Sequence, residues 1–257
     1  MKRSVLMTLA FCLVCAVALS GMQTENINAL MAKGDSLADA WNHEMAAMTY
    51  MEVLKLDPSN YEATWKAGSE TTDFADNLPE DQKERKEALF GKAVTLCEKA
   101  TELNPEDWQG HFKLSVAYGR LALFRGGKKK IELSKMIKKE AEKAVELNPE
   151  ADLAYHVLGR WHQGLANLSW VLKSFAKVLY GGVPPASNEE SVAMFKKAIE
   201  INPNHIEHYL ELARTYEYMG EKDMMKEPLE KVLELPAVKE DDPELKKEAE
   251  EMLKKIK

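Results

Sequence analysis

Two arginines lie at the same position of a repeated sequence pattern, where their side chains could bind an anion. Arg160 and Arg214 each come eleven residues after the proline of an Asn-Pro pair. A guanidinium group suits carboxylate or phosphate because its planar fork donates two parallel hydrogen bonds. The alternative is that both arginines pair with neighbouring acids such as Glu217 or Glu211 and only hold helices together. The pattern therefore predicts an anion site and leaves structural ion pairing open.

Aromatic and further basic residues extend this candidate site. Trp65, Phe112 and His156 each come seven residues after a junction proline, and their rings could contact a ligand. Lys113 and Arg120 lie on nearly the same helical stripe as the arginines. The first helices of stacked helical hairpins line a concave surface, so we expect these side chains to face one groove. The predicted ligand-binding residues are Arg160, Arg214, Arg120, Lys113, His156, Trp65 and Phe112.

Two histidines and one cysteine are the other residues that could do chemistry. His205 and His208 lie three residues apart, with Glu207 between them. A metal site needs a third and a fourth ligand, which the nearby sequence does not supply. We therefore expect no metal and interpret both histidines as exposed or capping residues. Cys97 is the only cysteine after residue 20, and its apolar helix face indicates a buried, inert thiol.

The sequence also lacks the motifs of common enzymes and of nucleic-acid binders. Gly126-Gly127-Lys128 lacks the upstream glycine and the downstream hydroxyl of a phosphate-binding loop. Neither a nucleophile–base pair nor a His-Glu-x-x-His motif is evident. The formal net charge is −7, whereas a nucleic-acid-binding domain is normally basic. We expect a non-catalytic protein without a cofactor and without a nucleic-acid partner.

The N-terminus has the pattern of a signal peptide. Lys2 and Arg3 precede an apolar run over residues 5–19, and small residues at 18–20 suit cleavage near Ser20. The run is about fifteen residues long, short of the roughly twenty that span a bilayer. We expect removal of residues 1–20 and export of the remaining helical domain, residues 21–257, to the periplasm or outside the cell. The alternative is an uncleaved N-terminal segment that anchors the protein in a membrane.

An internal repeat marks the helices that position these residues. Four proline junctions and a degenerate fifth recur, at Leu56-Asp57-Pro58, Leu103-Asn104-Pro105, Leu147-Asn148-Pro149, Ile201-Asn202-Pro203 and Leu235-Pro236. Ten residues after the first four prolines stand small residues, namely Gly68, Ser115, Gly159 and Ala213. Eight residues before the same prolines stand Tyr50, Cys97, Ala141 and Phe195. Small residues let paired helices approach, and large residues fill the gap between them.

This pattern resembles the tetratricopeptide repeat, a helix-turn-helix of 34 residues. The prolines are 47, 44, 54 and 33 residues apart, so the first three units are longer than that standard. Breaks are expected at 77–80, 125–127 and 181–185, after a long helix over about 151–180. A short helix over 25–33 should stop at Gly34, and a last helix should start near Pro243. The expected fold is an all-α solenoid of about four elongated helical hairpins plus terminal helices.

A further set of residues narrows the resemblance. The set comprises Tyr155–Trp161, Leu168–Trp170, Pro184–Ser187, Glu189–Ser191, Phe195–Ala198 and Leu233–Val238 followed by Asp241-Asp242. Together these residues resemble the regulator of microtubule dynamics protein family, most clearly from Leu147 onward, and the N-terminus suggests an exported bacterial homologue. The resemblance implies a tetratricopeptide-like interaction module without catalytic residues. Animal members are linked to microtubules and to mitochondrial or endoplasmic-reticulum membranes, and one membrane-tethering member is described as binding phospholipid.

Two functions fit this interpretation. The first is a scaffold that holds a protein or peptide partner in the concave groove, with aromatic contacts from Trp65 and Phe112 and anion recognition by Arg160 and Arg214. The second is a lipid carrier that binds an anionic phospholipid in the same groove, with the headgroup on the same arginines. A continuous apolar cleft along the 151–180 helix would favour a lipid, and a shallow, wet groove would favour a peptide.

Overall fold

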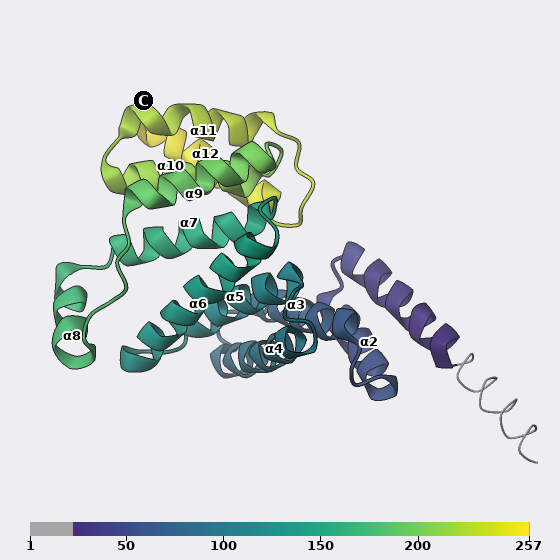
Figure 1. Ribbon diagram of the computed structural model, residues 1–257. Coiled ribbons are helices and arrows are strands. Elements are labelled where there is room, and N and C mark those ends of the chain that lie inside the picture. The colour runs from purple at the N-terminus through teal and green to yellow at the C-terminus, as the bar shows by residue number, and fades with distance from the viewer. Residues whose placement is uncertain (1–22, 257) are drawn as a thin grey trace, which may run out of the picture. The chain divides into compact units, whose positions relative to one another are not determined.

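The computed structural model describes residues 23–256, and within this range all regular elements are helical (Figure 1). After a helical segment at 23–39, the helices are α2 (His43–Leu56), α3 (Tyr61–Asp76), α4 (Lys83–Leu103), α5 (Trp108–Ala122), α6 (Gly127–Leu147), α7 (Asp152–Ala166), α8 (Trp170–Tyr180), α9 (Asn188–Ile201), α10 (Ile206–Met219), α11 (Lys222–Glu234) and α12 (Asp242–Ile256). This architecture confirms the expected all-α fold. The predicted signal peptide, residues 1–20, lies outside the described range and stays a prediction.

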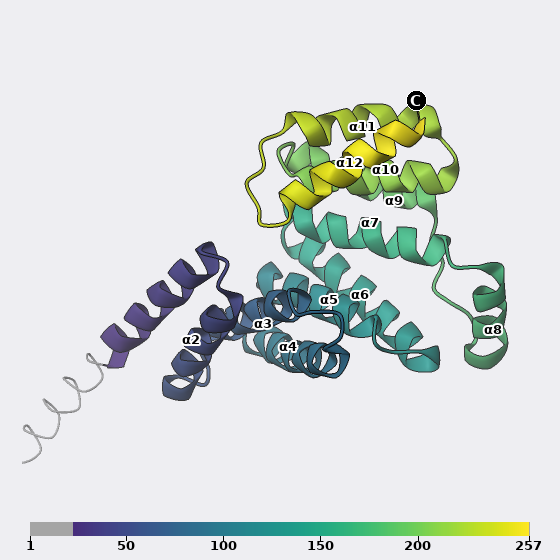
Figure 2. The same cartoon turned by 180° about the vertical axis from the view of Figure 1, so that it is seen from behind.

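The chain forms two compact units that divide between Leu103 and Asn104. In the N-terminal unit, α3 packs against α2 and α4. In the C-terminal unit, α5 pairs with α6, α7 with α9, and α10 with α11. Helix α12 packs against α10 and α11 at the end of the chain (Figure 2). The pairs α3–α4, α5–α6, α7–α9 and α10–α11 are the four predicted hairpins, and α8 is inserted between the two helices of the third.

The proline junctions set where the helices begin and end. Helices α2, α4, α6 and α9 end one residue before an Asx-Pro pair, and the next helix starts within a few residues. Proline disfavours helical backbone at the residue before it and lacks the N–H that a helix interior needs. Asn60 and Asp107 then cap α3 and α5, because their side chains accept hydrogen bonds from the backbone N–H groups of Ala63 and Gln109.

Small residues bring paired helices together, as the repeat pattern predicts. A Cβ built on Gly159 of α7 would lie 2.7–2.9 Å from ring atoms of Phe195 in α9. A Cβ on Gly68 of α3 would lie 2.5 Å from Sγ of Cys97 in α4. Cys97 is fully buried there, which confirms the predicted burial of this thiol. The small residue ten positions after one junction proline therefore packs against the residue eight positions before the next junction proline.

Two helix boundaries differ from the sequence prediction. The expected long helix over 151–180 is two helices, because Asn167 donates to the carbonyl of Gln163 at the end of α7 and Ser169 caps the start of α8. The first helix does not stop at Gly34 but continues to residue 39. Gly34 lies inside this helix. A glycine is needed at this position because the ring of Tyr50 occupies the space that a Cβ would fill. The break follows at Trp41, which has a positive φ of 57°.

A small polar cluster joins the first helical segment to α2 and α3 in the N-terminal unit. Asp35 accepts hydrogen bonds from the hydroxyl of Tyr50 (2.7 Å) and from Nζ of Lys66 (2.6 Å). Burial by itself raises the pKa of Asp35, but these two hydrogen bonds outweigh that effect and hold the pKa below its usual value. The ionised carboxylate therefore stabilises the folded unit.

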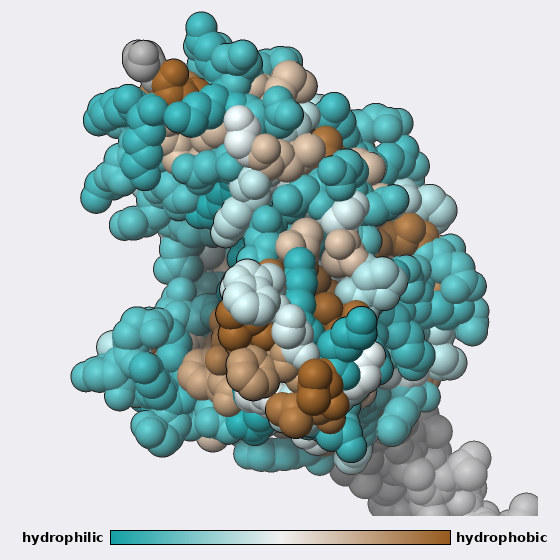
Figure 3. Space-filling view, turned by 90° about the vertical axis from the view of Figure 1, so that its left-hand side faces the viewer, coloured by the Kyte–Doolittle hydropathy of each residue, from teal (hydrophilic) through white to brown (hydrophobic). Residues whose placement is uncertain are grey.

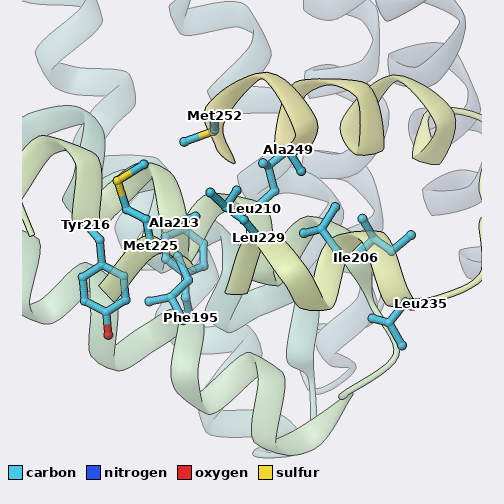
Figure 4. Close-up of a cluster of buried hydrophobic side chains, with 12 residues drawn as sticks. Phe195, Ile206, Leu210, Ala213, Tyr216, Met225, Leu229, Leu235, Ala249 and Met252 are labelled. Carbon is cyan, nitrogen blue, oxygen red and sulfur yellow. The ribbon is translucent and has the colours of Figure 1, made fainter. Parts of the chain in front are cut away.

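The core of the C-terminal unit is apolar and comes from four helices. Phe195, Ile206, Leu210, Met225 and Leu229 are almost fully buried among α9, α10 and α11, and α12 covers them (Figure 4). Burial of each such side chain contributes about 1.5–3 kcal/mol relative to exposure. Across the described residues, none of the helices combines the length and apolarity needed to cross a bilayer. This core fixes the position of α10, and α7 packs against α9 beside it.

Candidate functional site

An apolar pocket of about 660 Å³ lies between α8 and the helices α5, α6 and α7 of the C-terminal unit. Its walls are mostly aliphatic and aromatic side chains, with Leu172, Phe175, Leu179 and Tyr180 from α8, Trp161, Leu165 and Leu168 from α7 and the turn after it, Ile131 and Ile137 from α6, and Ala122 and Leu123 at the end of α5. This volume falls within the range of about 300–1,000 Å³ that small-molecule sites occupy. The pocket is therefore large enough for an organic ligand.

Helix α8 leaves its apolar face largely uncovered. Leu172, Phe175 and Leu179 line the pocket, yet they remain 56%, 60% and 61% exposed. Apolar side chains gather on the face of the molecule that carries α8 (Figure 3). Exposed clusters of large apolar side chains on a protein surface mark binding sites for apolar partners. The sequence prediction of a continuous 151–180 helix missed this feature, because only a break after α7 lets α8 turn back along the pocket.

The pocket has a basic rim. Arg125, Lys130 and Arg160 contribute to its lining, and the lining includes no acidic residue. Helix α8 itself carries Lys173 and Lys177 and no acid. Gly127 has a positive φ of 51°, and a Cβ there would lie 2.8 Å from the hydroxyl oxygen of Tyr180. Glycine at the start of α6 thus lets Tyr180 close one end of the pocket.

The predicted arginines share one buried carboxylate. Arg160 donates to Oε1 of Glu211 at 2.6 Å, and Arg214 donates to the same carboxylate. Arg214 also binds Glu248 of α12 through Nε and Nη2. Glu211 is 1% exposed, and Gln163 donates to it at 3.1 Å. This network joins α7, α10 and α12 and matches the alternative that the sequence left open, in which the arginines pair with acids such as Glu211.

The ion pairs leave the two arginines in different situations. Burial alone would lower the pKa of Arg214, but hydrogen bonds and charges from Glu248 and Glu211 outweigh it and raise the pKa. Arg214 is therefore held by ion pairs with two carboxylates inside the C-terminal unit. The side chain of Arg160 remains 46% exposed and reaches the pocket rim. Anion binding by these arginines stays a prediction, and Arg160 is the better placed of the two.

A second polar cluster surrounds three buried histidines at the start of α7 and α10. His156 and His208 face each other with their Nδ1 atoms 2.9 Å apart. Nε2 of His208 lies 3.1 Å from Asp152, and His205 stacks on His208 with ring centres 4.1 Å apart. His205 and His208 are 6% and 0% exposed, so the expectation of exposed histidines is wrong. His205 is at the N-cap position of α10, but its side chain makes no capping hydrogen bond.

The surroundings set the charge states of His208 and Asp152. Burial lowers the pKa of His208 to about 4, and the charges of His205 and His156 act in the same direction. Burial raises the pKa of Asp152, but hydrogen bonds from His208 and Asn202 outweigh it and lower the pKa to about 2. At neutral pH, His208 is therefore a neutral imidazole beside an ionised Asp152.

The other predicted site residues belong to α5 and to the N-terminal unit. Phe112 is buried against Trp108 in α5, with ring centres 6.1 Å apart, and Nζ of Lys113 lies 5.1 Å from the Phe112 ring centre. Arg120 is exposed in the last turn of α5. Trp65 belongs to the N-terminal unit, where Nζ of Lys66 lies 5.7 Å from its ring centre. Among the predicted set, the structure thus brings Arg160, Arg214 and His156 together on α7 and α10.

The fold defines a tetratricopeptide-like helical-repeat protein. A crystal structure of a thermophilic tetratricopeptide-repeat protein from Thermus thermophilus has the same architecture, with a TM-score of 0.66 at 17% sequence identity, covering 88% of this chain and 98% of that one. Residues 30–257 match the family described as Regulator of microtubule dynamics protein 1-3. The chain belongs to this family.

Mammalian relatives give the same assignment. Regulator of microtubule dynamics protein 1 of Mus musculus is 27% identical over 231 residues, which cover 90% of this chain and 75% of the relative. Regulator of microtubule dynamics protein 2 of Mus musculus is 28% identical over 233 residues, covering 90% of this chain but 56% of that longer protein. Family and helical-repeat fold together support a protein-interaction scaffold.

Proposed function

We propose that the protein is a non-catalytic binding module and that the pocket beside α8 takes an anionic lipid. The observation that carries this proposal is the uncovered apolar face of α8 opposite apolar walls from α6 and α7. Exposed apolar surface is unfavourable in water by about 25 cal/mol per Å², so an acyl chain in the pocket would remove that cost. An apolar pocket of this size supports a lipid ligand rather than a peptide.

The positive charge on the pocket rim supports a lipid with an anionic headgroup as the ligand. Arg125, Lys130 and Arg160 are the charged residues of the lining. A phosphate at the mouth of an apolar pocket would accept hydrogen bonds from guanidinium groups, which bind it in bidentate fashion. Arg160 already pairs with Glu211, and its exposed portion allows it to donate to a second acceptor as well. A neutral lipid would gain nothing from this rim, so anionic lipids should be preferred.

The test is native mass spectrometry with organic extraction on the purified full chain, followed by uptake of fluorescent phosphatidic acid from vesicles. Wild type should carry or take up lipid at a ratio of one to one. A double change, Phe175→Glu with Leu179→Glu, should abolish uptake because it puts two carboxylates into the apolar wall. The matched control is Val178→Glu, because Val178 is 82% exposed on the same helix and does not line the pocket. An empty wild type that takes up no lipid, or equal loss in the control, contradicts the proposal.

A protein partner is the second candidate for the same surface. Leu172, Phe175 and Leu179 lie at spacings of three and four residues, the pattern by which helices pack into the groove of a partner. An amphipathic helix of another protein could therefore lie against α8. Co-purification of one stoichiometric polypeptide, displaced by the Phe175→Glu and Leu179→Glu changes and with no lipid present, would favour this candidate over the lipid.

A further inference from the structure

Three potential metal ligands from two helices converge in the C-terminal unit. Asp152 is the first residue of α7, while His205 and His208 lie at the start of α10, more than fifty residues later. Oδ2 of Asp152 is 3.1 Å from Nε2 of His208 and 3.8 Å from Nδ1 of His205. One ligand atom from each of the three residues lies within 4.8 Å of the others. Histidine spacing alone does not indicate a site, but the carboxylate contributed by α7 supplies the third ligand.

The two separations measured from Asp152 are close to those of a zinc site. Zinc binds imidazole nitrogen and carboxylate oxygen at about 2.0–2.2 Å, so two ligand atoms in a tetrahedral arrangement lie about 3.3–3.5 Å apart. The observed distances of 3.1 and 3.8 Å fall on either side of that value. The rings of His205 and His208 are stacked, with an angle of 11° between their planes, so at least one ring would have to turn for both nitrogens to point at one ion. The backbone thus brings the three donors within reach of one ion, and side-chain rotation would complete the site.

The hydrogen bonds around His208 orient it as a ligand. If Nε2 of His208 binds an ion, its Nδ1 carries the proton and donates to Nδ1 of His156, 2.9 Å away. His156 then carries its own proton on Nε2, which lies 3.5 Å from Glu207. Protein metal sites commonly fix a histidine ligand by a hydrogen bond from its other nitrogen, with a carboxylate at the end. Every proton in this chain of groups has an acceptor.

Two other groups compete for the same atoms. Asn202 donates to Oδ2 of Asp152 at 2.9 Å, and Nζ of Lys239 lies 3.1 Å from Nε2 of His205. Lys239 is an exposed side chain in the segment before α12, so it can turn away into water. Its ammonium group would repel a cation at this position. Loss of Lys239 should therefore strengthen metal binding rather than weaken it.

We propose that Asp152, His205 and His208 bind a divalent transition metal of the zinc class, with a fourth position open to water. Two imidazoles and one carboxylate form a ligand set that zinc uses in proteins, and these ligands also suit cobalt as a spectroscopic probe. Asp152 keeps 20% of its side chain exposed, which gives an ion a route to the site. A bound ion would link the start of α7 to the start of α10 and so stiffen the last two hairpins.

The experiment is titration of the tag-free full chain with cobalt chloride, read by visible absorption, and then with zinc chloride in competition with a chromogenic chelator. Wild type should bind one ion and show the intense absorption of tetrahedral cobalt. Asp152→Asn and His205→Ala should each weaken binding at least about 100-fold, because even changes behind the ligands cost 10–100-fold. Lys239→Ala should bind several-fold more tightly.

Control variants test the location of the ion. His162→Ala removes a half-buried histidine outside the cluster, and His43→Ala removes a member of the other His/Asp/Glu group, formed with Glu70 and Asp73 in the N-terminal unit. Both should bind metal as wild type does, and circular dichroism should show equal helix content in all variants. Absence of stoichiometric binding, unchanged binding in Asp152→Asn and His205→Ala, or loss in either control overturns the proposal.

Discussion

Replacing Gly159 by alanine should destabilise the C-terminal unit, although alanine is the better helix former. Alanine in a helix interior is favoured over glycine by about 0.8–1.0 kcal/mol. At Gly159 the added Cβ would lie 2.7–2.9 Å from three ring atoms of Phe195, which is fully buried. Overpacking of this kind costs about 1–3 kcal/mol. The sum is a net loss of about 0–2 kcal/mol in the free energy of unfolding.

The ring has little room to move away. Phe195 makes an edge contact with His156, with ring centres 5.3 Å apart, and Ser191 one turn earlier donates to the carbonyl of Gly159 at 2.9 Å. A shift of α9 would lengthen that hydrogen bond as well. The matched control is Gly119→Ala in α5, where nothing lies within 4 Å of the new Cβ. The free energy of unfolding of this control should rise by up to about 1 kcal/mol, because alanine favours the helix and meets no neighbouring atom.

Native-state hydrogen exchange read by mass spectrometry on peptides from α7 and α9 measures this opening free energy separately from the N-terminal unit. Gly159→Ala should be less stable than Gly119→Ala by about 1–3 kcal/mol, which isolates the overpacking cost. Adding Phe195→Leu to Gly159→Ala should recover part of the loss, because a smaller side chain makes room for the methyl group. Equal stabilisation by both alanine variants would refute the close approach of α7 and α9 as described.

Two other predictions concern buried and half-buried charges. Because Asp35 has a lowered pKa in the folded chain, its contribution is present above the unfolded value near 3.9 and is lost as the pH falls through the folded pKa. Asp35→Asn should therefore cost about 0.2–1 kcal/mol at pH 7, with no difference from wild type in acid, as measured by urea unfolding at a series of pH values. Glu211→Gln should cost about 1.5–3 kcal/mol, because two arginines lose a buried charged acceptor, although Arg214 keeps Glu248 and Arg160 keeps the more distant Glu207, 3.9 Å away. The same assay on Glu217→Gln, an exposed position of the same helix, should give a change within about 0.5 kcal/mol, and an equal loss there would contradict a special role for Glu211.

The repeat pattern predicted the helical hairpins because the signals that end a helix are local. A proline acts on the backbone of the residue before it and on its own missing N–H, whatever the rest of the chain does. The contact of Gly159 with Phe195 was also predictable, since residues at fixed distances from successive junctions must face each other in a hairpin. The continuation of the first helix past Gly34 could not be predicted. Glycine is needed at this position because the ring of Tyr50 packs against the backbone, and not because the chain turns there.

Only part of the candidate site could be predicted. Glu211 was a possible partner of Arg214 from its spacing of three residues on one helix, but nothing in the sequence links Glu248 of α12 to that pair. The pocket depended on the break at Asn167, where side-chain hydrogen bonds compete with helix continuation and the balance is decided by the neighbouring helices.

By itself, the sequence determined the class of fold, the ends of most helices and which small residues meet which large ones. These features follow from backbone geometry and from helix periodicity, which act over a few residues. Tertiary structure alone decided that α8 turns its apolar face to an open pocket, and that Asp152 meets two histidines more than fifty residues away. Such meetings depend on how helices cross and pack, and packing is a property of the whole folded unit.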